Sequence, residues 1–219
     1  MKGLTVLILA ALTLGASERA WSQPLHPPGP VAAADASGLF GYLGSKKPFD
    51  RYNDWDHSAY GGGTFGWYWT DHLKTDVEAG VSTRSEKEAY FSTTVGTRYI
   101  SKESTFHFTT RRLAIGQQYQ FFRNAMFHPY LGGGLELTWE KTERQDSPET
   151  IYDPSGRQSA PGAPAIAYPD RTELVPRGYA ATGFKAYMSS KTFFRSDLKL
   201  AFASGLEEVL LRFGFGVDF

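Results

Sequence analysis

The last ten residues of the chain, Leu210-Leu-Arg-Phe-Gly-Phe-Gly-Val-Asp-Phe219, decide its fold. Their side chains alternate between an apolar set and a set that is mostly charged or reduced to glycine. The apolar set is Leu211, Phe213, Phe215, Val217 and Phe219, with Arg212, Gly214, Gly216 and Asp218 between them. A period of two residues indicates a β-strand, because successive side chains of a strand point to opposite faces. This strand alone does not distinguish a soluble sheet from a membrane barrel, since both turn an apolar face away from water.

Further segments of about ten residues repeat the alternation. They lie near residues 37–44, 62–69, 74–82, 112–121, 130–140, 179–188 and 193–202. Glycines interrupt the polar faces of these segments, and glycine weakens a strand interior unless space is short. The interior of an eight-stranded barrel is that narrow, and side chains fill it. The sequence therefore predicts an all-β protein, an eight-stranded antiparallel up-and-down transmembrane β-barrel.

The polar faces of these segments carry acids and bases in equal number. Charges withdrawn from bulk water are costly unless they are paired. We therefore expect opposite charges to pair inside the barrel and to leave no open pore. The residues expected to form these lumen ion pairs are Lys74, Asp76, Glu78, Arg112, Glu136, Glu140, Lys185, Arg195, Asp197, Lys199, Arg212 and Asp218.

The start of the chain has the pattern of a signal peptide. Lys2 precedes an apolar run over residues 4–14, and small and polar residues follow, ending in Ala20-Trp-Ser22. The run is too short to span a bilayer as a helix, which takes about 20 residues. We expect residues 1–22 to be cleaved, residues 23–36, rich in proline and alanine, to form a flexible periplasmic arm, and residues 37–219 to form the barrel domain.

The composition excludes several classes of function. The chain has no cysteine, which rules out disulfides, thiol catalysis and thiolate metal sites. Its formal net charge is zero and it has no basic stripe, so nucleic acid is not an expected partner. The glycine runs 61–63 and 132–134 do not open helices and lack the lysine of a phosphate-binding loop. Asp54, Asp56 and His57 cluster in a polar stretch that we interpret as an exposed loop. No cofactor or metal is expected.

Connections between the segments alternate in length. Those at residues 70–72, 122–127 and 189–191 are short, whereas 45–58, 85–104 and 142–172 are long and polar. Outer-membrane barrels have short periplasmic turns and longer external loops, so the long connections are expected outside the cell. Aromatic residues gather at the short-turn end, as a membrane-interface girdle requires. The predicted girdle consists of Trp67, Trp69, Tyr119, Phe121 and Phe194, and the same end holds Phe122, Phe127, Tyr187, Phe193 and Phe219.

Three landmarks carry a family resemblance. They are Pro129-Tyr-Leu-Gly-Gly-Gly134, Trp69-Thr-Asp-His-Leu73 and the alternating strand that ends in Phe219. With them, residues 37–219 resemble the small outer-membrane β-barrel family typified by the membrane domain of OmpA and by OmpX and OmpW. The resemblance implies location in the cell outer membrane, contact with its lipids and lipopolysaccharide, and recognition by the barrel assembly machinery. It also implies that Phe213, Phe215 and Phe219 act as the assembly signal.

The resemblance leaves three functions open. The expected one is a structural or surface-interaction scaffold that displays the loops 45–58, 85–104 and 142–172 to an extracellular ligand, with no catalytic residue. The first alternative is a lipid A acylase or deacylase, in which a histidine would activate a hydroxyl. Its candidates are His107 with Ser104 or Thr109, and His57 with Ser58, although neither pair has the His-x-Ser-Asn pattern of the deacylases. The second alternative is a narrow conduit for small apolar molecules, which the charged polar faces argue against.

Overall fold

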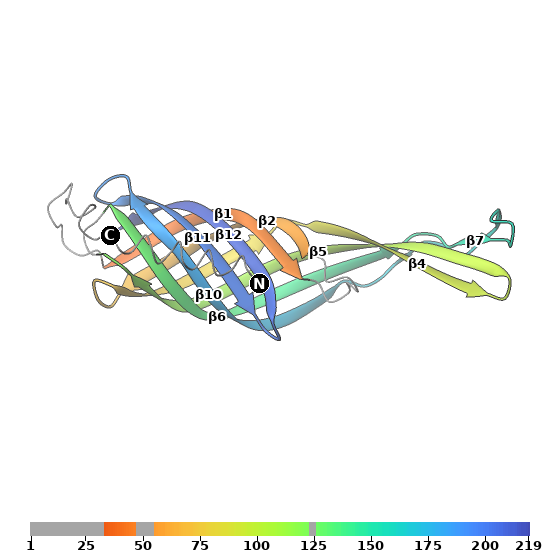
Figure 1. Ribbon diagram of the computed structural model, residues 1–219, viewed down its shortest axis with the longest axis horizontal. Coiled ribbons are helices and arrows are strands. Elements are labelled where there is room, and N and C mark those ends of the chain that lie inside the picture. Colours follow the sequence, from red (N-terminus) through yellow and green to blue (C-terminus); the bar gives the residue numbers. More distant parts are fainter. Residues whose placement is uncertain (1–32, 47–54, 123–125) are drawn as a thin grey trace, which may run out of the picture.

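The computed structural model describes residues 33–46, 55–122 and 126–219. Eight long strands close into an antiparallel barrel, as Figure 1 shows. These are β1 (Ala34–Lys46), β2 (Trp55–Tyr68), β3 (Leu73–Ser82), β5 (Arg98–Gln120), β6 (Phe127–Asp146), β10 (Arg171–Tyr187), β11 (Thr192–Phe202) and β12 (Leu206–Asp218). Each pairs with the next barrel strand along the chain, and β12 returns to pair with β1. The predicted fold is confirmed.

The barrel closes where the two ends of the domain meet. The register of β1 with β12 runs from Asp35 opposite Asp218 to Ser45 opposite Glu208. Beyond it, the Phe219 N–H donates to the Ala34 carbonyl at 2.9 Å. Since β1 begins at Ala34, residues 34–36 of the predicted arm belong to the barrel. The predicted signal peptide 1–22 and the rest of the arm up to residue 32 lie outside the described residues.

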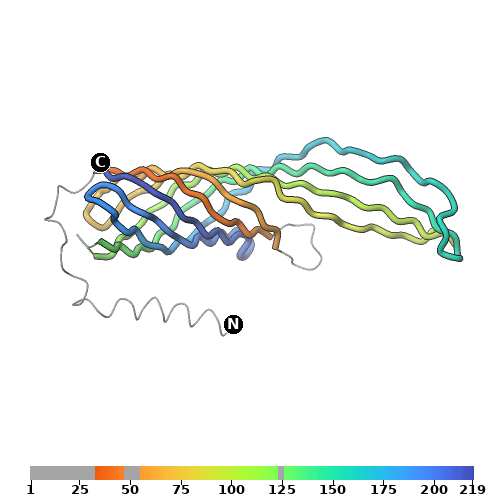
Figure 2. Tube along the Cα trace, turned by 90° about the horizontal axis from the view of Figure 1, so that it is seen from above, coloured from red at the N-terminus to blue at the C-terminus, as the bar shows by residue number. Residues whose placement is uncertain are grey.

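One end of the barrel has short turns, and the other continues into a tall sheet. At that end β5, β6 and β10 run past the barrel wall, and Figure 2 shows them continuing its long axis. Four further strands join them there: β4 (Ser85–Val95), β7 (Thr150–Tyr152), β8 (Gln158–Pro161) and β9 (Ile166–Ala167). Residues 85–108 and 142–172 together are called the extension.

The extension corrects the expectation that 85–104 and 142–172 are loops. β4 pairs with β5 without interruption from Ser85 opposite Phe108 to Val95 opposite Arg98. In the second segment, β6 continues to Asp146, and β7, β8 and β9 occupy part of the remaining residues. The loop prediction was wrong for these stretches because the strands remain paired beyond the point where their outward residues stop being apolar. Of the third predicted loop, residues 45–46 and 55–58 belong to β1 and β2, and 47–54 lie outside the described residues.

Side-chain polarity reverses along the single strand β5. Within the barrel, Leu113 and Ile115 point outward and are 44% and 53% exposed, while Arg112 points inward and is buried. At the base of the extension two inward positions are instead apolar, and Phe106 and Phe108 are only 6% and 5% exposed. The outer wall of the barrel is therefore suited to lipid, whereas these β5 positions of the extension have the apolar-in, polar-out pattern of a sheet in water.

Among the residues that the structure describes, no helix is both long and apolar enough to cross a membrane.

Candidate functional site

The interior of the barrel contains a network of ion pairs that begins near the short turns. Asp35 has no exposed surface, and the Lys74 ammonium lies 2.8 Å from its Oδ2. Lys185 pairs with the same oxygen, and the Tyr68 hydroxyl donates to it at 2.8 Å. Lys185 also lies 3.4 Å from Asp218 on the neighbouring wall. One carboxylate is thus shared by two fully buried cations.

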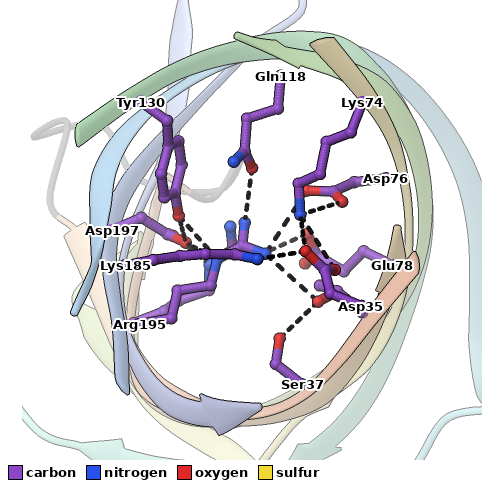
Figure 3. Close-up of polar contacts among 12 residues, drawn as sticks. Asp35, Ser37, Lys74, Asp76, Glu78, Gln118, Tyr130, Lys185, Arg195 and Asp197 are labelled. Carbon is purple, nitrogen blue, oxygen red and sulfur yellow. Dashed lines mark hydrogen bonds and ion pairs between the residues drawn. The ribbon is translucent and has the colours of Figure 1, made fainter. Parts of the chain in front are cut away.

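The network continues through the middle of the barrel. Figure 3 shows its side chains pointing from the wall toward the centre. Asp76 lies 2.7 Å from Lys74 and 3.5 Å from Arg195. Arg195 pairs with Asp197 at 3.0 Å, and Asp197 accepts a bond from Arg212 Nε at 2.5 Å. Ion pairs therefore connect opposite walls.

A third group carries the network toward the extension. Glu78 lies 2.5 Å from Arg212 and 3.2 Å from Lys199. Lys199 also pairs with Glu136 at 2.5 Å, and Glu136 lies 3.3 Å from Arg112. Acids and bases alternate along this path, so each buried charge faces at least one opposite charge.

The network ends at the mouth of the barrel. Arg112 lies 3.0 Å from Glu208, which in turn lies 3.4 Å from Arg177. Arg177 also pairs with Glu140 at 2.6 Å and with Glu207 at 3.0 Å. Ion pairs thus succeed one another without a break from Asp218 near the short turns to Glu207 at the mouth.

The structure places all twelve of the predicted lumen residues on this path. It adds Asp35, Arg177, Glu207 and Glu208, which sequence reasoning missed. Asp35 lies within the proline- and alanine-rich stretch 23–36 that was assigned to the arm. Arg177 and Glu208 each lie two residues before a recognised alternating segment, so extending the period of two would have found both.

Tyrosines and glycines account for the close packing around the network. A Cβ atom on Gly80 would overlap the ring of Tyr60, and one on Gly116 would overlap the hydroxyl of Tyr179. These glycines stand where an inward tyrosine crosses the interior, which is the crowding that the sequence predicts. A central cavity measures about 20 Å³, room for about one water molecule.

The predicted girdle residues lie on the outer surface near the short turns. Trp69 is 63% exposed, and its indole ring meets that of Trp67 with centroids 6.2 Å apart. Tyr119 and Phe121 are likewise exposed and form an edge-to-face pair at 5.2 Å, and Phe194 is half-buried. Such amphipathic rings suit the boundary between hydrocarbon and headgroups.

Two aromatic residues expected on that rim point inward instead. Phe193 has no exposed surface, and the Lys185 ammonium lies 3.9 Å from its ring centroid. The Tyr187 hydroxyl donates to Asp218 at 2.5 Å. Both belong to the polar phase of their strands, so their rings cover charges in the interior and do not meet lipid.

The aromatic residues of the predicted assembly signal project from β12. Phe215 and Phe219 are more than half exposed and Phe213 is half-buried. Phe215 packs against Phe194 of β11 at 5.5 Å, and Phe213 against Phe40 of β1 at 6.2 Å. The side chains thus lie on the outer face of the strand that closes the barrel.

The histidines of the alternative enzyme hypothesis are not brought against their hydroxyl partners. Ser104 lies on the inner face of β5 and donates to Asp146 at 2.8 Å, whereas His107 lies on the outer face, 3.5 Å from Glu86. His57 stacks on Tyr42 at 5.2 Å on the outer surface, while the adjacent Ser58 lies on the opposite face of β2. Thr109 shares the face of His107 but is two residues along the strand.

Asp146 organises the inner face of the extension. Arg144 Nε donates to its Oδ1 at 2.7 Å, and Ser104 donates to the same oxygen at 2.8 Å. Lys102 and the Tyr168 hydroxyl donate to Oδ2 at 2.9 and 3.3 Å. The hydrogen bonds from Arg144, together with those from Lys102 and Ser104, hold the pKa of the Asp146 carboxyl well below its ordinary range.

Aromatic rings surround the guanidinium of Arg144. Its carbon lies 4.5 Å from the ring centroid of Tyr168, 5.5 Å from that of Phe106 and 6.0 Å from that of Phe91. Stacking on aromatic faces is favourable for arginine, and this cluster ties β4, β5 and β6 to the segment after β9. The extension is thereby packed by its own side chains.

Comparisons with known proteins connect the fold to membrane proteins. No family model and no curated protein sequence matches the chain. Neisserial surface protein A is 10% identical, with a TM-score of 0.50 over 85% of this chain and 96% of that one. The N-terminal β-barrel domain of Pseudomonas aeruginosa OprF is 13% identical, with a TM-score of 0.49 over 86% of this chain and 98% of that one. Ail of Yersinia pestis, solved with the heparin analogue sucrose octasulfate, is 10% identical, with a TM-score of 0.46 over 85% and 99%.

The chain has the fold of an outer-membrane β-barrel. At these identities the likeness concerns the fold and not a particular activity. Its apolar outer wall and aromatic rim agree with that fold and with the expected location in the cell outer membrane.

Proposed function

We propose that the protein is an outer-membrane scaffold, in which a barrel closed by ion pairs anchors an extension that recognises a ligand outside the cell. The observation that carries this proposal is the continuity of β5, whose 23 residues run from the membrane wall to the tip of the extension. A continuous paired strand transmits the rigidity of the barrel to the extension, whereas a mobile loop would leave the extension free to move relative to the barrel.

The length of the extension supports the proposal that its tip is displayed outside the cell. Leu113 is the last outward apolar residue of β5 before the polarity reverses, and Trp139 lies in the neighbouring row on β6. From Leu113 to Arg98 the strand covers roughly 50 Å at about 3.3 Å per residue. An extension of this size would reach well beyond the lipid headgroups if it faces outward.

The orientation rests on the contrast between the two ends of the barrel. Short turns are typical of the periplasmic side of outer-membrane barrels, and long connections of the external side. On that pattern the extension faces the outside, and β12 ends at the periplasmic rim. The outward Phe213, Phe215 and Phe219 are then available to the barrel assembly machinery before insertion, which supports their role as the assembly signal.

The ion-pair network supports a closed lumen. Its charges cross the interior from several walls, and a polar, charged interior is unsuited to passage of apolar molecules. In planar bilayers we expect no discrete conductance steps above the lipid baseline. Steps of porin size would overturn the closed-lumen proposal and would leave the orientation proposal untouched.

Cysteine labelling tests display directly, because the chain has no cysteine of its own. Ser92→Cys places a thiol on an exposed position of β4, and Ser190→Cys places one in a short turn at the other end. A large maleimide polyethylene glycol added to intact cells should label Ser92→Cys, and should label Ser190→Cys only after the outer membrane is permeabilised. Labelling in the reverse order would overturn the proposed orientation.

A further inference from the structure

The tip of the extension contains an open cleft between two hairpin turns. Thr94, Tyr99 and Tyr152 lie opposite one another on adjacent strands β4, β5 and β7. Directly paired residues share one face of a sheet, so these three side chains stand in a row. The cleft has a volume of about 450 Å³ and is lined by Thr94, Thr97, Tyr99, Tyr152, Asp153, Pro154 and Gly156.

Two aromatic rings form one part of this cleft. The ring centroids of Tyr99 and Tyr152 are 5.9 Å apart, and the ring planes are inclined at 51°. Rings inclined in this way can both present a face to a group seated between them. The face of an aromatic ring carries negative charge density and attracts cations within about 6 Å of its centroid.

A carboxylate stands beside the two rings. The turn after β7 folds around Asp153 Oδ1, which accepts bonds from the Ser155 N–H at 2.8 Å, the Ser155 hydroxyl at 2.6 Å and the Arg157 N–H at 2.9 Å. All three bonds use Oδ1, which leaves the second oxygen of the carboxylate to interact with a ligand. The hydrogen bond from the Ser155 hydroxyl lowers the pKa of Asp153, so this group is anionic at neutral pH.

The lining of the cleft selects a class of ligand. Of its seven lining residues, one is anionic and none is lysine, arginine or histidine, which favours a cation over a phosphate or sulfate. Tyrosine rings and a proline favour an organic cation with apolar substituents over a hydrated metal ion. Aromatic faces with a neighbouring carboxylate are the surroundings that suit a methylated ammonium.

We propose that the cleft at the tip of the extension binds an alkylated ammonium group, with the cation over Tyr99 and Tyr152 and beside Asp153. This inference rests on the proposed function, in which the extension is displayed outside the cell. It names the class of ligand that the displayed extension would bind. Such a group occurs both on choline lipid headgroups and on small soluble molecules.

The test compares choline with its uncharged isostere, 3,3-dimethyl-1-butanol. The whole protein is kept in a glucoside detergent, because choline-based detergents carry the group under study. Saturation-transfer NMR of the ligand methyl protons should show saturable binding of choline, and the isostere should bind at least about threefold more weakly, as expected for an exposed cation–π site. No saturable choline signal, or equal affinity of the two ligands, would overturn the proposal.

Single substitutions distinguish the contribution of the two tyrosine rings to choline binding from that of the Asp153 carboxylate. Tyr99→Leu and Tyr152→Leu should each weaken choline binding by roughly two- to fivefold. Asp153→Asn keeps an oxygen at Oδ1 for the turn, and should weaken choline binding while leaving the isostere unaffected. Tyr90→Leu, which removes a 76% exposed ring elsewhere on β4, serves as the control and should bind as the unmodified protein does. Unchanged choline binding in both cleft tyrosine variants would place the ligand elsewhere.

A vesicle assay then identifies the source of the ammonium group. Capture of phosphatidylcholine vesicles, without capture of phosphatidylglycerol vesicles, would support a lipid headgroup, whereas choline binding without vesicle capture would support a soluble ligand. The labelling of Ser92→Cys keeps this proposal distinct from the display proposal. If that thiol is labelled on intact cells and choline does not bind, the ligand assignment alone is wrong.

Discussion

The barrel and the extension share the strand β5, but the polarity of its inward and outward side chains differs between the two regions. In the barrel, Leu113 and Ile115 face outward and Arg112 faces inward. In the extension, Phe106 and Phe108 face inward. The backbone pairing with β6 does not change between the two regions. The reversal therefore reflects the solvent outside each region, lipid around the barrel and water around the extension.

The two regions also differ in how they hold charges. Lys74, Lys185 and Asp35 are fully buried and depend on one another, whereas Lys141 pairs with Glu143 and Asp170 on a surface open to water. A buried charge that loses its partner remains in a medium that solvates it poorly, and an exposed one is solvated by water. The same kind of ion pair thus has a large consequence where it is buried, as at Asp35, and a small one where water reaches it, as at Asp170.

Removal of the shared carboxylate should produce the largest effect. Asp35→Ala leaves Lys74 and Lys185 without their common partner and should lower the free energy of unfolding by about 3 to 5 kcal/mol. Urea unfolding in detergent, followed by the gel shift between folded and boiled protein, measures this change. The matched variant Asp170→Ala removes an exposed partner of Lys141 and should alter stability by less than about 0.5 kcal/mol. Equal effects of the two variants would refute the distinction between the regions.

A new charge on the outer wall should produce the next largest effect. Ile115→Arg places a cation on the lipid-facing middle of β5, at an expected loss of about 2 to 4 kcal/mol in a bilayer. Thr105→Arg adds the same side chain to the outer face of the same strand within the extension, where water surrounds it and almost no change is expected. Refolding into vesicles at a series of urea concentrations measures both. A comparable loss in Thr105→Arg would show that lipid covers the extension.

The reversal also explains which parts of the fold could be predicted from sequence. Alternation with apolar residues outward and charges inward identified all eight barrel strands and the twelve lumen residues, because lipid and a narrow lumen each impose one polarity. The segments 85–104 and 142–172 are also β-paired, but their outer residues, such as Glu86 and Glu143, are polar. Strands whose outward residues are polar therefore resemble polar loops when apolar outward residues are expected.

Contacts between distant strands were beyond sequence analysis for another reason. Asp35 and Lys185 are separated by 150 positions in the chain, and the closure of the barrel brings them together. Their spacing carries no periodic signal, so a balanced count of charges indicates that pairs form without indicating which residues pair. The tip cleft likewise depends on the register of β7 with β5, which short segments do not reveal.

A substitution on the inner face of the extension should have a local effect of intermediate size. Phe106→Ala removes a ring that stacks on Phe108 and covers Arg144, and should destabilise the extension by about 1.5 to 3 kcal/mol, the contribution of a buried apolar side chain. Protease cleavage in β4 should become faster while the urea midpoint of the barrel stays unchanged. Thr105→Ala, on the outer face, is the control. A loss of barrel stability in Phe106→Ala would mean that the two regions unfold as one unit.

The smallest expected effect is a change of the extension with pH. The pKa of Asp146 is lowered by its hydrogen bonds from Arg144, Lys102 and Ser104, so its contribution to stability is present above the ordinary value of 3.8 and is lost as the pH falls below that value. Hydrogen exchange of the extension should therefore be constant from pH 7 to about pH 4, after correction for the intrinsic rate, and should accelerate only in stronger acid. Asp146→Asn should show weakened protection already at pH 7, because the ionic partner of Arg144 is absent. Loosening already near pH 6 in the unmodified protein would show that Asp146 is not the group that controls the extension.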